Sequence, residues 1–172
     1  KPGNSFEADG SIGYEFNSNE TNVQGGATLP IAEGASLRVA GLLQHLDKGW
    51  IKSNVTGFDS PRTRNYAGRA ILHLDPNPDL KVQFKAEYDR LLDEGENIQV
   101  YKQSLAVPGL FDETKLDGRT SNSSSGAPFF QNGFAYLKNQ TYQADINYQL
   151  LGGQLTSTTS YRKYMSSTSS DG

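Results

Sequence analysis

Residues 80–89 of the chain read LKVQFKAEYD, and this stretch decides the fold. Apolar and polar side chains alternate through it without exception. Successive side chains of a β-strand point to opposite faces of the sheet, so the stretch predicts a strand with one apolar and one strongly polar face. The apolar face would carry Leu80, Val82, Phe84, Ala86 and Tyr88.

Six further stretches show the same alternation and bring the expected strands to seven. One of them, residues 142–150, alternates as cleanly as the first, and the others are less regular. Each stretch has about ten residues, the length that crosses a bilayer at a tilt. In chain order the six are residues 6–15, 22–31, 36–46, 66–74, 142–150 and 154–164.

The connections between these strands alternate in length, except that the first one on the long-loop side, residues 17–21, is also short. Turn residues such as Pro, Gly, Asn and Asp crowd into short turns near 30–35, 75–79 and 151–153. Long loops, residues 48–64 and 91–139, join strands at the opposite ends. Short turns on one rim and long loops on the other are typical of outer-membrane β-barrels, although a soluble sandwich can show the same pattern by chance.

Tyrosines mark the long-loop ends of the expected strands. When the strands are threaded up and down, five tyrosines fall at that end and share parity with the apolar face. Amphipathic aromatic side chains gather at membrane interfaces, so we expect a lipid-facing girdle there. Its members are Tyr14, Tyr66, Tyr88, Tyr142 and Tyr161.

Charged side chains take the other parity. A charge that faces lipid at mid-membrane costs about 2–4 kcal/mol, so we expect these residues to face a wet lumen or the polar surface of a plug inside it. In a soluble sheet the same residues would face solvent. They are Glu7, Asp9, Arg38, Arg69, Lys81, Lys85, Glu87, Asp89, Asp145 and Arg162.

The composition excludes several functions. The 172 residues suffice for one domain, and a net charge of −3 predicts no nucleic-acid partner. The sequence has no Cys, no apolar run long enough for a membrane helix, and no nucleophile-elbow, phosphate-loop or zinc motif. His45 and His73 each lie two residues before an Asp, which we interpret as ordinary strand polarity. We therefore expect no enzyme activity, no catalytic residue, no cofactor and no metal site.

The longest connection, residues 91–139, is expected to fold over the mouth of the barrel. Aromatic side chains in such a loop can hold a ligand by stacking or apolar burial, or can form a small core of the loop itself. The candidate ligand-binding residues are Tyr101, Phe111, Phe129, Phe130 and Tyr136.

Several short segments resemble, in order and spacing, the first part of the β-barrel of TonB-dependent outer-membrane receptors. They are similar to the exit from the plug into the first barrel strand, to the third strand and its loop, to the fourth strand and its turn, and to a later upward strand. In that order the segments are KPG at 1–3 with FEA at 6–8, ASLRVAG at 35–41 with DKGWIKS at 47–53, GRAILHLDP at 68–76, and LTSTTSYR at 155–162.

This resemblance implies active uptake of a small molecule or metal chelate, such as a siderophore, a vitamin complex or an oligosaccharide. The implied partners are outer-membrane lipid, the plug domain of the same full-length protein and the TonB complex, reached through parts that this chain lacks. Because family barrels have roughly 22 strands, residues 1–172 are expected to be a partial β-barrel domain of the bacterial cell outer membrane. The expected fold is all-β: an antiparallel, up-and-down transmembrane segment of about seven strands, an incomplete part of a larger barrel.

Two other classes of protein fit parts of the pattern. One is a soluble β-sandwich that binds carbohydrate, and the other is a small complete outer-membrane barrel that acts as an adhesin. Single-chain bacterial barrels close with even strand numbers, so the odd count speaks against the adhesin, as does the lack of a terminal aromatic residue. For the sandwich the deciding observation is burial: Leu80, Val82 and Phe84 packed against a second sheet or a helix would exclude the transporter.

Overall fold

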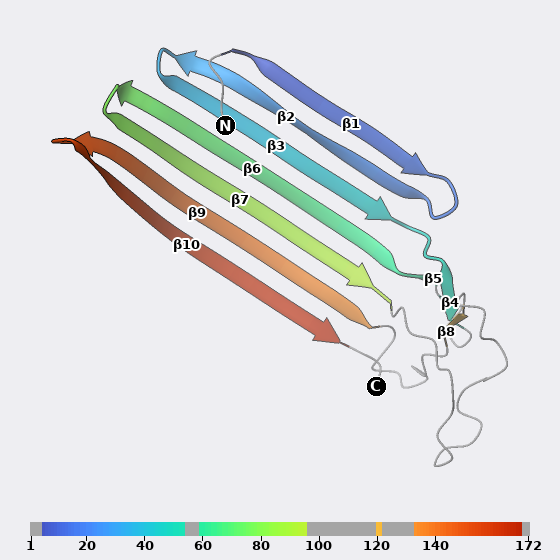
Figure 1. Cartoon of the computed structure of the whole chain (residues 1–172). Helices are drawn as coiled ribbons and strands as arrows, with labels where there is room; N and C mark the ends of the chain where they lie inside the picture. Colours follow the sequence, from blue (N-terminus) through green and yellow to red (C-terminus); the bar gives the residue numbers. More distant parts are fainter. Residues whose placement is uncertain (1–4, 54–58, 96–119, 122–132, 170–172) are drawn as a thin grey trace.

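The structure is a computed structural model that describes residues 5–53, 59–95, 120–121 and 133–169. The described residues form strands and turns, without a helix. Seven strands make one antiparallel sheet, and three short strands make a second sheet near one end of it (Figure 1).

The large sheet has the strand order β1-β2-β3-β6-β7-β9-β10, so its neighbours in space are also neighbours along the chain. Its strands are β1 (Glu7–Glu15), β2 (Glu20–Ala32), β3 (Ala35–Leu46), β6 (Arg62–Asn77), β7 (Leu80–Glu94), β9 (Phe134–Leu150) and β10 (Gly153–Ser169). The small sheet joins β4 (Ile51–Ser53) to β5 (Asp59–Ser60) and β8 (Thr120–Ser121).

All seven expected strands are present, and the all-β, antiparallel, up-and-down prediction is confirmed. Four of them are much longer than the expected ten residues: β6, β7, β9 and β10 have 16, 15, 17 and 17. They extend into segments that the alternation placed in loops, so that β7 runs to Glu94 and β9 starts at Phe134. Main-chain pairing continues there although Arg90 and Lys138 interrupt the apolar alternation.

The pairing register fixes which side chains share a face, because directly opposed residues of antiparallel strands point to the same side. Phe84 of β7 lies opposite Leu72 of β6 and Ala144 of β9. We call the side that carries Phe84 the apolar face and the opposite side the polar face. Further members of the apolar face are Ile12, Val23, Leu37, Val39, Leu43, Tyr66, Val82, Tyr88, Tyr142, Ile146 and Tyr161.

No element of the described chain packs on either face of the large sheet, which is a single layer (Figure 1). Phe84 is 48% exposed, and Leu46 is the one buried hydrophobic residue among those described. A β-sandwich would bury one face under a second sheet about 10 Å away. The described residues therefore contain no sandwich core, and Leu80, Val82 and Phe84 have no second layer against them.

The large sheet is open. Within the described chain β1 and β10 each have one neighbour, so they form its two edges and the sheet does not close into a barrel. The structure confirms the seven-stranded antiparallel sheet, and its place in a larger transmembrane barrel stays a prediction.

The turns at one end of the sheet contact each other. The Asp75 N–H, near the end of β6, donates a hydrogen bond of 2.6 Å to the carbonyl oxygen of Gly34 in the β2–β3 turn. Gly34 has a φ of 72°, and a Cβ there would collide with the carbonyl oxygen of Asp75. Only glycine fits this contact without strain.

Candidate functional site

The polar face carries a network of paired side chains. All ten charged residues that alternation assigned to it share that face in the register. Arg38 lies 3.2 Å from Asp9, and Glu87 pairs with both Arg69 at 3.6 Å and Lys85 at 3.4 Å. The Asp9–Arg38 and Arg69–Glu87 pairs cross between strands and the Lys85–Glu87 pair lies along β7, so half of the ten charged residues are in ion pairs with one another.

Neutral side chains extend this network toward β10. The Gln143 amide and the Thr158 hydroxyl both donate to Asp145, at 2.8 Å in each case. The guanidinium of Arg162 donates to the Asn139 side chain at 2.6 Å. Side chains on this face therefore hold one another in fixed positions across neighbouring strands.

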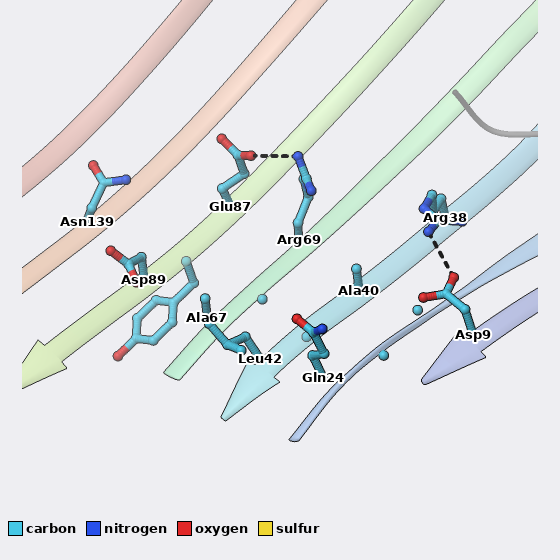
Figure 2. Close-up of a pocket in the computed structure, with 15 residues that line it drawn as sticks. Asp9, Gln24, Arg38, Ala40, Leu42, Ala67, Arg69, Glu87, Asp89 and Asn139 are labelled. Atoms are coloured by element: carbon cyan, nitrogen blue, oxygen red, sulfur yellow. Dashed lines mark hydrogen bonds and ion pairs between the residues drawn. The ribbon is translucent and has the colours of Figure 1, made fainter. Parts of the chain in front are cut away.

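A hollow of about 580 Å³ lies on the polar face. Its floor includes small residues of β2, β3 and β6: Gly26 lies directly opposite Ala40, and Ala67 lies two residues along β6 from Arg69, the residue opposite Ala40. Charged side chains stand around this floor, with the Asp9–Arg38 pair on one side and the Arg69–Glu87 pair on the other (Figure 2).

Arg38 links the hollow to the interior of the layer. Besides Asp9, its guanidinium donates a hydrogen bond of 2.9 Å to the hydroxyl of Thr28, whose side chain has no exposed surface. A Cβ on the neighbouring Gly26 would lie 3.3 Å from this guanidinium. Because Gly26 and Ala40 have little or no side chain, the hollow has room for the Arg38 guanidinium and for a polar ligand beside it.

Charged and polar side chains line the hollow around its small residues. Its two cations, Arg38 and Arg69, are paired with Asp9 and Glu87, and the described residues show no arrangement of a nucleophile beside a base. His45 and His73 contact Asp47 and Asp75, each at 3.0 Å, on separate strands. Within the described chain no three His, Asp or Glu side chains lie close enough to hold a metal ion.

Five of the seven tyrosines that the described strands place on the apolar face form a slanted line across the sheet, and Tyr136 and Tyr148 lie off it. Directly opposed residues can be followed from strand to strand across the sheet. Followed from Tyr14 on β1, they end at Ser167 on β10. Tyr161, the tyrosine of β10, lies six residues along that strand from Ser167. Six strand steps span about 29 Å and six residues about 20 Å, so the line is inclined by about 35° to the perpendicular of the strands. Between these ends the line passes through Tyr66, Tyr88 and Tyr142.

The predicted ligand-binding residues divide into two groups. Tyr101, Phe111, Phe129 and Phe130 lie outside the described residues. Tyr136 belongs to β9 instead of a loop, and its side chain shares the apolar face, where the Arg90 guanidinium carbon lies 5.6 Å from the ring centroid. Tyr136 is therefore on the side of the sheet opposite the hollow.

The alternation pattern did not reveal the hollow. It placed Arg38 and Arg69 on the polar face, but it could not show that small residues of three strands line up between them. Only the register brings Gly26 opposite Ala40. The sequence does contain small residues at polar-face positions of these strands. They predict a hollow only once the strand pairing is known, because the pairing decides which of them lie close together.

Glu15 closes the β1–β2 turn, beyond Tyr14 at the end of the strand. The Ser18 hydroxyl donates to its carboxylate, as do the amides of Asn17 at 3.0 Å and Ser18 at 2.7 Å. These hydrogen bonds, led by that of the Ser18 hydroxyl, lower the pKa of Glu15 from 4.5 to about 2.

No helix among the described residues is long and apolar enough to cross a membrane. Comparisons with protein-family models, with curated proteins and with solved structures gave no significant match.

Proposed function

We propose that this chain forms part of the wall of a TonB-dependent receptor in the bacterial outer membrane. Its apolar face contacts lipid, and its polar face lines the lumen. The receptor takes up a siderophore, a vitamin complex or an oligosaccharide with energy delivered by the TonB complex. The chain has no catalytic role in this process.

The observation that carries the proposal is the slanted tyrosine line at the border of an uncovered apolar face. Strands of outer-membrane barrels tilt by about 35–45° from the membrane normal. A girdle that is level with the membrane must therefore cross the strands at a slant, and the inclination of about 35° agrees with this requirement. A soluble sheet has no reason to arrange its tyrosines along such a line.

The length of the apolar strip supports the same placement. On β6 it runs from Tyr66 to Leu74, nine residues or about 27 Å along the strand. At a tilt of about 35° this gives a band about 22 Å tall, close to the roughly 25 Å of known barrels.

In this placement the hollow faces the plug domain of the same protein. Its paired charges offer hydrogen-bond donors and acceptors at fixed positions, which suits a polar protein surface or a polar ligand passing the wall. The cost of placing these charges in lipid, about 2–4 kcal/mol for each one at mid-membrane, supports the lumen as their side.

Fractionation and gel migration test the proposal. The full-length protein is expected in the outer-membrane fraction, and its unboiled form should migrate differently from the boiled form in SDS gels because a closed barrel resists the detergent. A folded, soluble monomer without detergent would contradict the proposal and favour the carbohydrate-binding sandwich.

Transport is tested separately in a strain that lacks the gene. Uptake of one labelled nutrient of the three classes should fall in this strain, and should fall equally in a strain without TonB. Unchanged uptake of all three classes in the deletion strain would exclude the receptor function, even for a protein in the outer membrane.

A further inference from the structure

Four cations lie on the apolar face just beyond the tyrosine line. The register places Arg64, Arg90, Lys138 and Lys163 on the successive strands β6, β7, β9 and β10. Each lies two residues from the tyrosine of its strand, or four on β9, and always toward the end with the long connections. The cations thus form a row that runs alongside the tyrosines.

No carboxylate of the described residues pairs with these four cations. On the polar face Arg38, Arg69 and Lys85 have carboxylate partners, whereas Arg162 bonds to the Asn139 side chain and Lys81 has no carboxylate partner among the described residues. Among the described strands of the large sheet, Glu94 is the one acidic residue with apolar-face parity, and it lies at the end of β7 opposite Arg62. The cationic row therefore carries charge that the described chain does not neutralise.

The centre of the row places two like charges together. Arg90 and Lys138 are directly opposed in the register, an arrangement that destabilises a sheet. Tyrosine rings hold both of them, with the Lys138 ammonium 5.7 Å from the Tyr88 ring centroid and Arg90 over Tyr136. Two cations fixed side by side without an anion form a site that suits an anionic group from outside the chain.

We propose that this cationic row binds the phosphate groups of an outer-leaflet lipid. The inference rests on the proposed function, since the row lies at headgroup level only if the apolar face is in the bilayer. Lys and Arg near a membrane surface attract anionic headgroups by about 1 kcal/mol each, which is about fivefold in affinity.

Continuity of the surface decides in favour of a lipid. The row borders the apolar strip directly, so an anion bound there lies beside exposed side chains such as Tyr88 and Tyr142. An occupant with a phosphate head and hydrocarbon chains covers both parts. A free phosphate or an acidic peptide would satisfy the cations and leave the apolar face in water.

The test uses the full-length protein in non-ionic detergent, titrated with diphosphoryl lipid A and with the same lipid after removal of its phosphates. Native mass spectrometry counts the bound lipid. The wild-type protein should prefer the phosphorylated form, and Arg90→Gln with Lys138→Gln should weaken its binding about twentyfold, while binding of the dephosphorylated form stays unchanged.

The double variant Lys81→Gln with Lys85→Gln is the matched control, because it removes the same charge from the polar face of β7. It should bind both lipids as the wild type does. In lipid-free detergent the Arg90 and Lys138 variant should unfold at no lower temperature than the wild type, since it removes a like-charge pair.

Equal binding of the two lipids by the wild type, or full binding by the Arg90 and Lys138 variant, would overturn this inference. If the protein is nevertheless in the outer membrane and heat-modifiable, the proposed function survives and the lipid site alone fails. A soluble protein without detergent would end both proposals.

Discussion

At the scale of the residue, the two faces of one strand have opposite tolerances. Val82 and Gln83 are adjacent on β7, both are half-buried, and their side chains point to opposite sides of the sheet. In the proposed placement Val82→Arg would set a charge in the lipid-facing strip, on the short-turn side of its middle, at a cost below the roughly 2–4 kcal/mol of the midplane, whereas Gln83→Arg adds a cation to the polar face. We expect Val82→Arg to reduce the heat-modifiable form in outer-membrane fractions and Gln83→Arg to leave it intact. Equal effects at both sites would mean that the assignment of faces is wrong.

A second residue-scale prediction concerns acid. The pKa of Glu15 is lowered in the folded chain, so its ionised form stabilises the β1–β2 turn above the unfolded value of 4.5. This contribution is lost as the pH falls from 4.5 through about 2. Carbon NMR of the Glu15 carboxyl should give a midpoint near the lower value, and the Asn17 and Ser18 amides should become less protected over the same range. A midpoint at the ordinary value would show that the turn leaves this carboxylate unbound, and Glu15→Gln should remove the pH dependence.

At the scale of the element, two turn glycines allow the cost of backbone strain to be measured separately from the cost of a steric collision. Gly34 and Gly152 both lie in turns with positive φ, 72° and 81°, but only Gly34 has backbone atoms where a Cβ would be. Gly152→Ala should therefore cost about 1 kcal/mol from strain alone, and Gly34→Ala roughly 2–4 kcal/mol because it also pushes the turn away from Asp75. The temperature at which the compact gel band disappears measures both variants. If the two lose the same stability, the contact between the turns contributes nothing.

The strands were predictable from sequence where alternation was complete, as in the first part of β7 and the last part of β9. Their extensions were not, because Arg90 and Lys138 have apolar-face parity and break the hydrophobic period. A pattern of hydrophobicity finds the part of a strand that faces an apolar medium, whereas the ladder of hydrogen bonds extends further. For the same reason Tyr136 was expected in a loop and lies in β9.

The hollow depended on information of another kind. Alternation correctly gave the side of every charged wall residue, because it concerns one strand at a time. The floor of Gly26, Ala40 and Ala67 depends on the alignment of three strands, and a shift of one residue in any strand would remove it. The sequence therefore predicted the chemistry of the polar face and not its shape.

At the scale of the whole molecule, the slant of the tyrosines becomes a measurable angle. If the line lies level with the membrane surface, the strands tilt by about 35° from the membrane normal. Polarised infrared spectroscopy of the full-length protein in oriented bilayers should give a mean strand tilt between about 30° and 45°. Strands that lie flat on the bilayer would contradict both the tilt and the proposed wall.

The two edges of the large sheet determine how the segment can enter a bilayer. Along β1 and β10 every second N–H and C=O group points away from the sheet, and in hydrocarbon each unsatisfied group costs several kcal/mol. Over the length of β10 the penalty is on the order of tens of kcal/mol, more than the apolar side chains recover. If the apolar face lies in lipid, as proposed, these seven strands therefore cannot insert one hairpin at a time, because each intermediate would leave unpaired edge groups in hydrocarbon. In the proposed placement they would enter lipid in a single concerted step with further strands of the receptor, and a block to that step would leave the whole set outside the membrane.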